Sequence, residues 1–140
     1  MRSEPSALLL DTHVWIWFND GLPELSEQLR QLVDDAARRG EVWVSIISVW
    51  EVSLLYSKQR LRLQGSCLDW VQRALAPPLA LAALTPGIAV DCNTLPGGFH
   101  SDPADRIITA TARVEGMTVV TRDRQILDYA AQGYVSALAC

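Results

Sequence analysis

The stretch Ala7-Leu8-Leu9-Leu10-Asp11, at residues 7–11, is an unbroken apolar run that ends on an acid. A run this short and this apolar is typical of a strand buried on both faces, as in a parallel sheet. Residues 12–18 then predict a helix, so the chain begins as a strand followed by a helix. Asp11 therefore stands where the strand ends and the helix begins.

The same alternation continues along the rest of the chain. Further strands are predicted at residues 42–44, 79–84 and 117–120, with an edge strand at 134–138. Helices are predicted at residues 26–39, 45–58, 66–75, 102–116 and 123–131, and another begins at Thr85-Pro86. Ser45 or Ser48 is the expected cap of the helix at 45–58. Alternating strands and helices favour an α/β fold around a parallel sheet. Without repeats or linkers, the 140 residues predict a single domain, residues 1–140.

Composition limits the class of protein. Hydrophobic residues make up 49% of the chain, which argues against disorder. The 12 basic and 16 acidic residues give a formal net charge of -4, which argues against a general coat on nucleic acid. A nuclease stays open, because the acids of an active site count as charge until a metal binds. The three scattered cysteines indicate free thiols in a reducing cytosol rather than a zinc site or disulfides.

The expected location is cytoplasmic. The N-terminus does not have the pattern of a signal peptide. No uncharged apolar run approaches the roughly 20 residues needed to cross a bilayer, so no membrane association is expected.

Four acids lie in or beside apolar runs at strand ends and helix starts: Asp11, Glu51, Asp105 and Asp123. A carboxylate in such surroundings is costly unless a positive group meets it. The carboxyl ends of parallel strands form the crevice where open α/β sheets bind ligands, so acids after two strands can converge there. Four carboxylates in such unfavourable surroundings, in one small chain, indicate that they share a divalent cation. Hard carboxylate oxygens suit Mg²⁺ or Mn²⁺.

Each acid also has a structural interpretation. Asp11 could be only the N-cap of the helix at 12–18. Asp102, followed by Pro103, is interpreted as a helix cap, and Asp105 is evenly balanced between a first-turn residue and a ligand. Glu51 has no basic residue within a helical turn, so a solvated helix face explains it poorly. Among the histidines, His13 is expected to pack or cap, and His100 to brace the loop before Asp102 or touch substrate.

Taken together, four segments resemble the PIN-domain ribonucleases, and more narrowly the VapC-type toxins of bacterial toxin–antitoxin pairs. The segments are Leu9-Leu10-Asp11-Thr12-His13-Val14, Ile47-Ser48-Val49-Trp50-Glu51-Val52, Phe99-His100-Ser101-Asp102-Pro103-Ala104-Asp105-Arg106-Ile107-Ile108 and Val120-Thr121-Arg122-Asp123. Each motif is weak alone, but four in this order and spacing are specific, and the resemblance covers about residues 7–138.

The resemblance implies a PIN-like, three-layer α/β/α fold with a central parallel sheet. Carried over by position, the acids Asp11, Glu51, Asp105 and Asp123 would be both catalytic and metal-binding, and Thr12 and Thr121 would support them. The implied reaction is Mg²⁺- or Mn²⁺-dependent hydrolysis of RNA, with the acids holding the metal. The family also implies a cognate antitoxin partner and a homodimer.

Arg106 and Arg122 flank two of the acids and are the expected phosphate contacts of an RNA substrate. Two other classes of α/β protein with an acidic site, one an enzyme and one a signalling domain, match the sequence less well. A haloacid-dehalogenase phosphatase needs a second acid where His13 stands, and a receiver domain needs a lysine after a late strand, whereas the single lysine is Lys58. The alternative of another class is a catalytically inactive PIN-like module that binds protein, against which the presence of all four acids argues.

Overall fold

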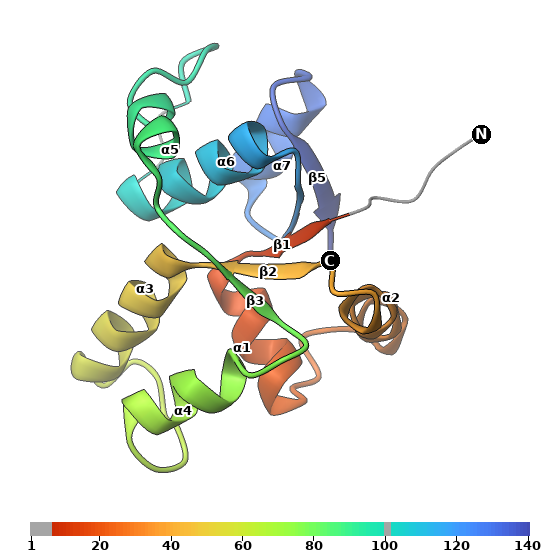
Figure 1. Ribbon diagram of the computed structural model, residues 1–140, viewed down its shortest axis with the longest axis vertical. Coiled ribbons are helices and arrows are strands. Elements are labelled where there is room, and N and C mark those ends of the chain that lie inside the picture. Colours follow the sequence, from red (N-terminus) through yellow and green to blue (C-terminus); the bar gives the residue numbers. More distant parts are fainter. Residues whose placement is uncertain (1–6, 100–101) are drawn as a thin grey trace.

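The computed structural model describes residues 7–99 and 102–140. Its centre is a five-stranded sheet in the order β3-β2-β1-β4-β5, in which every pair of neighbouring strands is parallel (Figure 1). The strands are β1 (Leu8–Leu10), β2 (Val42–Ser45), β3 (Ala80–Ala82), β4 (Thr118–Thr121) and β5 (Ser136–Ala139). The predicted parallel α/β sheet and its edge strand near the C-terminus are confirmed.

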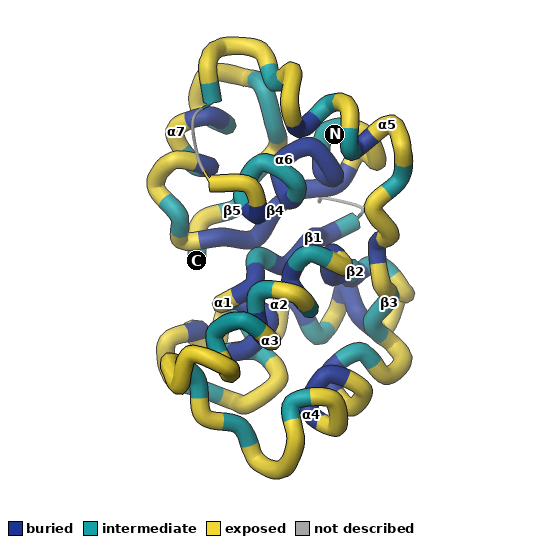
Figure 2. The backbone as a smooth tube through the Cα atoms, turned by 90° about the vertical axis from the view of Figure 1, so that its left-hand side faces the viewer, coloured by how far each residue is buried: buried dark blue, intermediate teal, exposed yellow. Residues whose placement is uncertain are grey.

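The apolar run at the start of the chain is the middle strand. Leu8 of β1 is in register with Val42 on one side and with Thr118 on the other. Leu9 and Leu10 have no exposed surface, because helices cover both faces of the sheet (Figure 2). The absence of a polar residue in β1 therefore follows from its central place in the sheet.

Seven helices of the described chain pack on the sheet in two layers (Figure 1). They are α1 (Thr12–Asp20), α2 (Glu27–Arg38), α3 (Ile46–Ser57), α4 (Cys67–Ala74), α5 (Pro86–Asp91), α6 (Pro103–Glu115) and α7 (Arg124–Ala131). One core cluster packs the four helices α1, α2, α3 and α4 against one face of the sheet. It contains the buried Trp15, whose ring meets Trp70 edge to face. A second joins α6 and α7 with the other face, through Ile108 and Ile126. The predicted three-layer α/β/α arrangement is confirmed.

Short polar side chains start the helices, as predicted for Asp11 and Asp102; the cap Asp123 was not predicted. The N-caps are Asp11, Ser26, Ser45, Ser66, Thr85, Asp102 and Asp123, each accepting a hydrogen bond from a backbone N–H of the helix that follows. Ser45, not Ser48, is thus the cap of α3. Three of these caps are acids, and all three lie at the same end of the sheet.

Several element boundaries differ from the prediction by one or two residues, and β5, for example, begins at Ser136. Strand β3 covers only Ala80–Ala82 instead of residues 79–84, because its one partner, β2, ends at Ser45, which already caps α3. Helix α1 continues to Asp20 and ends at Gly21, whose φ of 65° is in the left-handed region. Across the described helices, none has the length and hydropathy to cross a membrane.

Candidate active site

The four acids predicted to act together line one cavity of about 400 Å³ beyond the carboxyl ends of β1 and β4. We call it the acid cavity. Its lining residues are Asp11, Thr12, His13, Val14, Trp17, Glu51, Asp102, Asp105, Arg122 and Asp123. Acids separated by up to 112 positions in the chain therefore share one hollow, as the parallel-sheet argument predicted.

The fold brings the acids here from four different helices. Asp11 follows β1 and caps α1, and Asp123 follows β4 and caps α7. Asp105 lies in the first turn of α6, whose cap is Asp102. Glu51 comes from the middle of α3 and caps nothing. Three helix N-termini thus point at the cavity, and each favours a nearby negative charge by roughly 0.3–1 kcal/mol.

A threonine at the end of β4 holds two of the acids. The buried Thr121 Oγ1 donates to Asp11 Oδ2 at 2.6 Å and accepts from the backbone N–H of Asp123 at 2.9 Å. The backbone N–H of Thr12 donates to the other oxygen, Asp11 Oδ1, at 2.8 Å. Both oxygens of Asp11 are therefore oriented before any ligand arrives.

A second chain of hydroxyl groups holds Glu51. Thr12 Oγ1 donates to Glu51 Oε1, and Thr12 Oγ1 also lies 2.8 Å from Ser48 Oγ. Ser48 and Thr12 are buried, so the bond between them forms away from water, whereas the bond to Glu51 is partly buried. The carboxylate of Glu51, on α3, is thereby tied to the start of α1.

Burial and mutual repulsion make two of the acids hard to ionise. Burial raises the pKa of the Asp11 carboxyl above its ordinary value, and the nearby Asp123 adds to this, while the Thr121 bond partly offsets it. Burial also raises the pKa of Glu51, with Asp11 and Asp102 contributing. In the described residues, no ion pair joins Asp11, Glu51 or Asp123 to a basic side chain. A cation in the cavity would relieve this cost.

One wall of the acid cavity is aromatic and basic. His13 and Trp17 lie four residues apart on α1, with ring centroids 6.1 Å apart. The Arg122 guanidinium lies 4.5 Å from the Trp17 ring centroid and donates to the backbone carbonyls of Glu24 and Cys140. Arg122 is thus held in place beside the acids without neutralising them.

The donor set suits a hard divalent cation, since carboxylate oxygens dominate the lining. Among the described residues, no three His, Cys, Asp or Glu side chains lie close enough together to hold a metal ion. Mg²⁺ does not require this, because it keeps several waters and takes one or two carboxylates directly. The acids fit such an open shell better than a closed protein cage.

Some predicted residues need a different description. Asp102 is the helix cap that its sequence predicts, but it also lines the cavity and contributes to the raised pKa of Glu51. His13 was expected to pack or cap and is instead an exposed residue of the cavity wall. Arg106 is half-buried beside Asp105 on α6 and is not among the lining residues. His100 lies outside the described residues.

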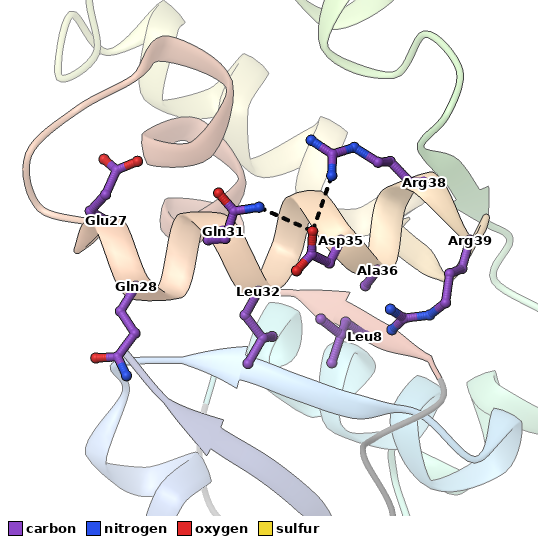
Figure 3. Close-up of a pocket in the computed structure, with 9 residues that line it drawn as sticks. All are labelled: Leu8, Glu27, Gln28, Gln31, Leu32, Asp35, Ala36, Arg38 and Arg39. Atoms are coloured by element: carbon purple, nitrogen blue, oxygen red, sulfur yellow. Dashed lines mark hydrogen bonds and ion pairs between the residues drawn. The ribbon is translucent and has the colours of Figure 1, made fainter.

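A larger hollow, of about 840 Å³, runs along α2 and is also lined by Leu8 of β1 (Figure 3). We call it the α2 groove. Most of its charges are paired: Asp35 accepts from Gln31 at 3.0 Å and forms an ion pair with Arg38 at 3.1 Å, and Arg39 pairs with Glu41 at 3.0 Å. Size therefore does not identify the functional site of this molecule, whereas the chemistry of the lining residues does.

The chain is similar in sequence to known proteins. The family model described as PIN domain matches residues 8–132. Ribonuclease VapC22 of Mycobacterium tuberculosis is 36% identical over 121 residues, covering 86% of this chain and 90% of that protein.

Solved structures share the fold at lower identity. The crystal structure of VapBC2 from Rickettsia felis bound to a DNA fragment from their promoter has a TM-score of 0.70 at 14% identity, covering 95% of this chain and 98% of that one. A toxin-antitoxin complex from Klebsiella pneumoniae has a TM-score of 0.59 at 20% identity, covering 84% and 87%. At these identities the structures support the fold alone.

Proposed function

The chain belongs to the PIN-domain family, and we propose that it is a metal-dependent endoribonuclease, the toxin of a toxin–antitoxin pair. The observation that carries this proposal is the acid cavity, where four carboxylates from four helices share one hollow. The similarity to Ribonuclease VapC22 supports RNA as the substrate.

In this proposal Asp11, Glu51, Asp105 and Asp123 hold Mg²⁺ or Mn²⁺. When bound, the ion supplies a Lewis acid that activates water and neutralises charge on the phosphodiester. The protein contributes orientation: Thr121 and the backbone N–H of Thr12 each fix one oxygen of Asp11, and the Thr12 hydroxyl fixes Glu51. The three helix N-termini favour the ionised carboxylates that the metal needs.

The basic and aromatic wall would receive the RNA strand. Arg122 is the better phosphate contact, because it is exposed, fixed against Trp17 and at the edge of the acid cavity. Arg106 is a second candidate, on the α6 turn that carries Asp105. Positive charge at these points would offset repulsion between the phosphates and the acids.

We also propose two protein partners. A cognate antitoxin follows from the proposed role as the toxin of a pair, and the toxin-antitoxin complex from Klebsiella pneumoniae contains a chain of the same fold. A homodimer is supported by an apolar strip on α3, where Trp50 is 56% exposed and Ile46, one turn before it, is 37% exposed. Exposed tryptophan is enriched where proteins meet.

The test is cleavage of RNA by the purified protein, freed from its neighbouring gene product, in Mg²⁺ or Mn²⁺ and in EDTA. We expect new RNA ends that require the metal and that disappear in Glu51→Gln. A protein that binds no Mn²⁺ beyond the level of Glu51→Gln, and leaves RNA intact, would be the inactive protein-binding module instead.

A further inference from the structure

Ser48 is a buried polar residue that the proposed reaction does not yet use. It lies on α3, one turn before Glu51, and has no exposed surface. A hydroxyl in such a place is costly unless it is hydrogen-bonded. Its partner is Thr12 Oγ1, 2.8 Å away on another helix.

Ser48 is not explained as a helix cap. The N-terminus of α3 is capped by Ser45, whose Oγ accepts from the backbone N–H of Ile47 at 3.1 Å. Ser48 lies inside the helix, where alanine has the higher helix propensity. The hydroxyl therefore contributes through its contact with Thr12 rather than through the backbone of α3.

The direction of the hydrogen bonds follows from counting protons. An ionised Glu51 carboxylate only accepts, and Thr12 has one hydroxyl proton to give. That proton goes to Glu51 Oε1, so the Ser48 hydroxyl must be the donor to Thr12 Oγ1. Ser48 in this way leaves the Thr12 hydroxyl with a single favourable orientation, toward the carboxylate.

We propose that Ser48 is a positioning residue, which orients the Thr12 hydroxyl toward Glu51 and thereby raises the affinity of the acid cavity for a divalent cation. The inference rests on the proposed function, because it assumes that Glu51 is a metal ligand. Residues that hydrogen-bond a ligand from behind typically change metal affinity about 10–100-fold when they are lost. Ser48 acts one bond further out than Thr12.

The test is direct binding of Mn²⁺ to the metal-free protein. Binding is measured as the loss of the EPR signal of hydrated Mn²⁺. We expect Thr12→Val to weaken binding roughly 10–100-fold and Ser48→Ala by a smaller factor, roughly fivefold. Ser48→Cys, which keeps a weaker donor on a larger atom, should fall between Ser48→Ala and the wild type. Thermal unfolding of each variant shows whether the fold is retained.

Ser45→Ala is the matched control. Ser45 is also a buried serine of the same segment, with 1% exposure, but the hydrogen bond of its hydroxyl is with the backbone N–H of Ile47, which caps α3. We expect this variant to lose stability and keep the wild-type affinity for Mn²⁺. An equal loss of affinity in Ser45→Ala would show that α3 is merely loosened, and would overturn the proposal.

A double-mutant cycle separates positioning from packing. If Ser48 acts through Thr12, then Ser48→Ala has no further effect on Mn²⁺ affinity in a Thr12→Val background. A full additional loss there, or wild-type affinity in Ser48→Ala alone, would refute the role of Ser48 while leaving the metal site intact. A wild-type protein that binds no Mn²⁺ and cuts no RNA would instead overturn both this inference and the proposed function.

Discussion

The α2 groove has about twice the volume of the acid cavity, about 840 against 400 Å³, yet the smaller hollow has the features of an active site. In the groove, Asp35 meets Arg38 in an ion pair. In the cavity, Asp11 and Glu51 are partly buried beside other acids, and their pKa values are raised. The contrast indicates that uncompensated charge locates function here, and that cavity size does not.

The strongest test exchanges one acid in each hollow. Asp11→Asn should lower RNA cleavage at least about 100-fold, because it removes a charged ligand while keeping the shape of the side chain. Asp35→Asn should leave cleavage unchanged, since that carboxylate only pairs on the surface. Rates on one RNA in saturating Mg²⁺ provide the measurement. Equal activity of Asp11→Asn and the wild type would remove the distinction between the two hollows.

Metal binding should stabilise the protein through the acid cavity alone. At a concentration of 100 times its dissociation constant, Mn²⁺ would add about 2.7 kcal/mol to the free energy of unfolding, or roughly 10 °C in the melting temperature. The increase should persist in Asp35→Asn and vanish in Glu51→Gln. Differential scanning fluorimetry with and without EDTA measures it, and an increase retained in Glu51→Gln would place the ion elsewhere.

The stability of the metal-free protein should depend on pH through the same two carboxyls. Their pKa values are raised in the folded state, so the fold holds these protons to a higher pH than the unfolded chain does. The stabilising contribution of these protons is complete when the pH is below the pKa values of the unfolded chain, about 4. It is lost as the pH rises through the pKa values of the folded protein. In EDTA, the wild type should therefore lose more stability than Asp11→Asn over that range.

Urea unfolding of both proteins at a series of pH values checks this expectation. Addition of Mg²⁺ above the folded pKa values should restore stability to the wild type only. Parallel pH curves for the wild type and Asp11→Asn would show that burial of Asp11 carries no electrostatic cost.

A smaller effect is expected at the basic residues of the two hollows. Arg122→Gln should weaken RNA binding and reduce the slope of log affinity against log salt by about 1, as for the loss of one phosphate contact. Arg38→Gln, in the α2 groove, should leave the slope unchanged. Binding is measured with Ca²⁺ in place of Mg²⁺ to limit cleavage. A slope unaffected by Arg122→Gln would assign that residue to bracing Trp17 alone.

The smallest effect is expected from the floor of the α2 groove. Leu32 is 38% exposed there, so Leu32→Gln should change the free energy of unfolding within about 0.5 kcal/mol. Cleavage and Mn²⁺ affinity should stay at wild-type values. A marked loss of activity in this variant would mean that the groove contributes to function after all.

Much of the fold was predictable because its signals are local. The apolar run of β1, the caps such as Ser26 and the stop at Gly116 each act within a few residues of their own position. The length of β3 was not predictable in this way. It depends on where β2 ends, at Ser45, which pairs with Ala82 across 37 positions of the chain.

The candidate site divides along the same line. Asp11 and Asp123 could be found from the sequence because they follow parallel strands whose ends meet, and Glu51 because it interrupts an apolar run, whereas Asp105 was evenly balanced until the family resemblance was considered. The hydroxyl chain from Ser48 through Thr12 could not, since its partners are 36 and 39 positions apart and leave no periodic pattern. His13 and Trp17 were missed as cavity residues because their spacing on α1 suits packing equally well.

Two of the acids cap helices, and this affects how these positions are expected to change during evolution. Asp11 and Asp123 start helices, so a lineage that had abandoned RNA cleavage would still be selected to keep them, or to replace them with other capping residues such as Asn or Ser. Glu51 caps no helix, and its buried charge is a burden to a protein without a metal. Among sequences related to this one, the residue at position 51 should therefore distinguish catalytically active proteins from inactive ones more clearly than Asp11 and Asp123 do.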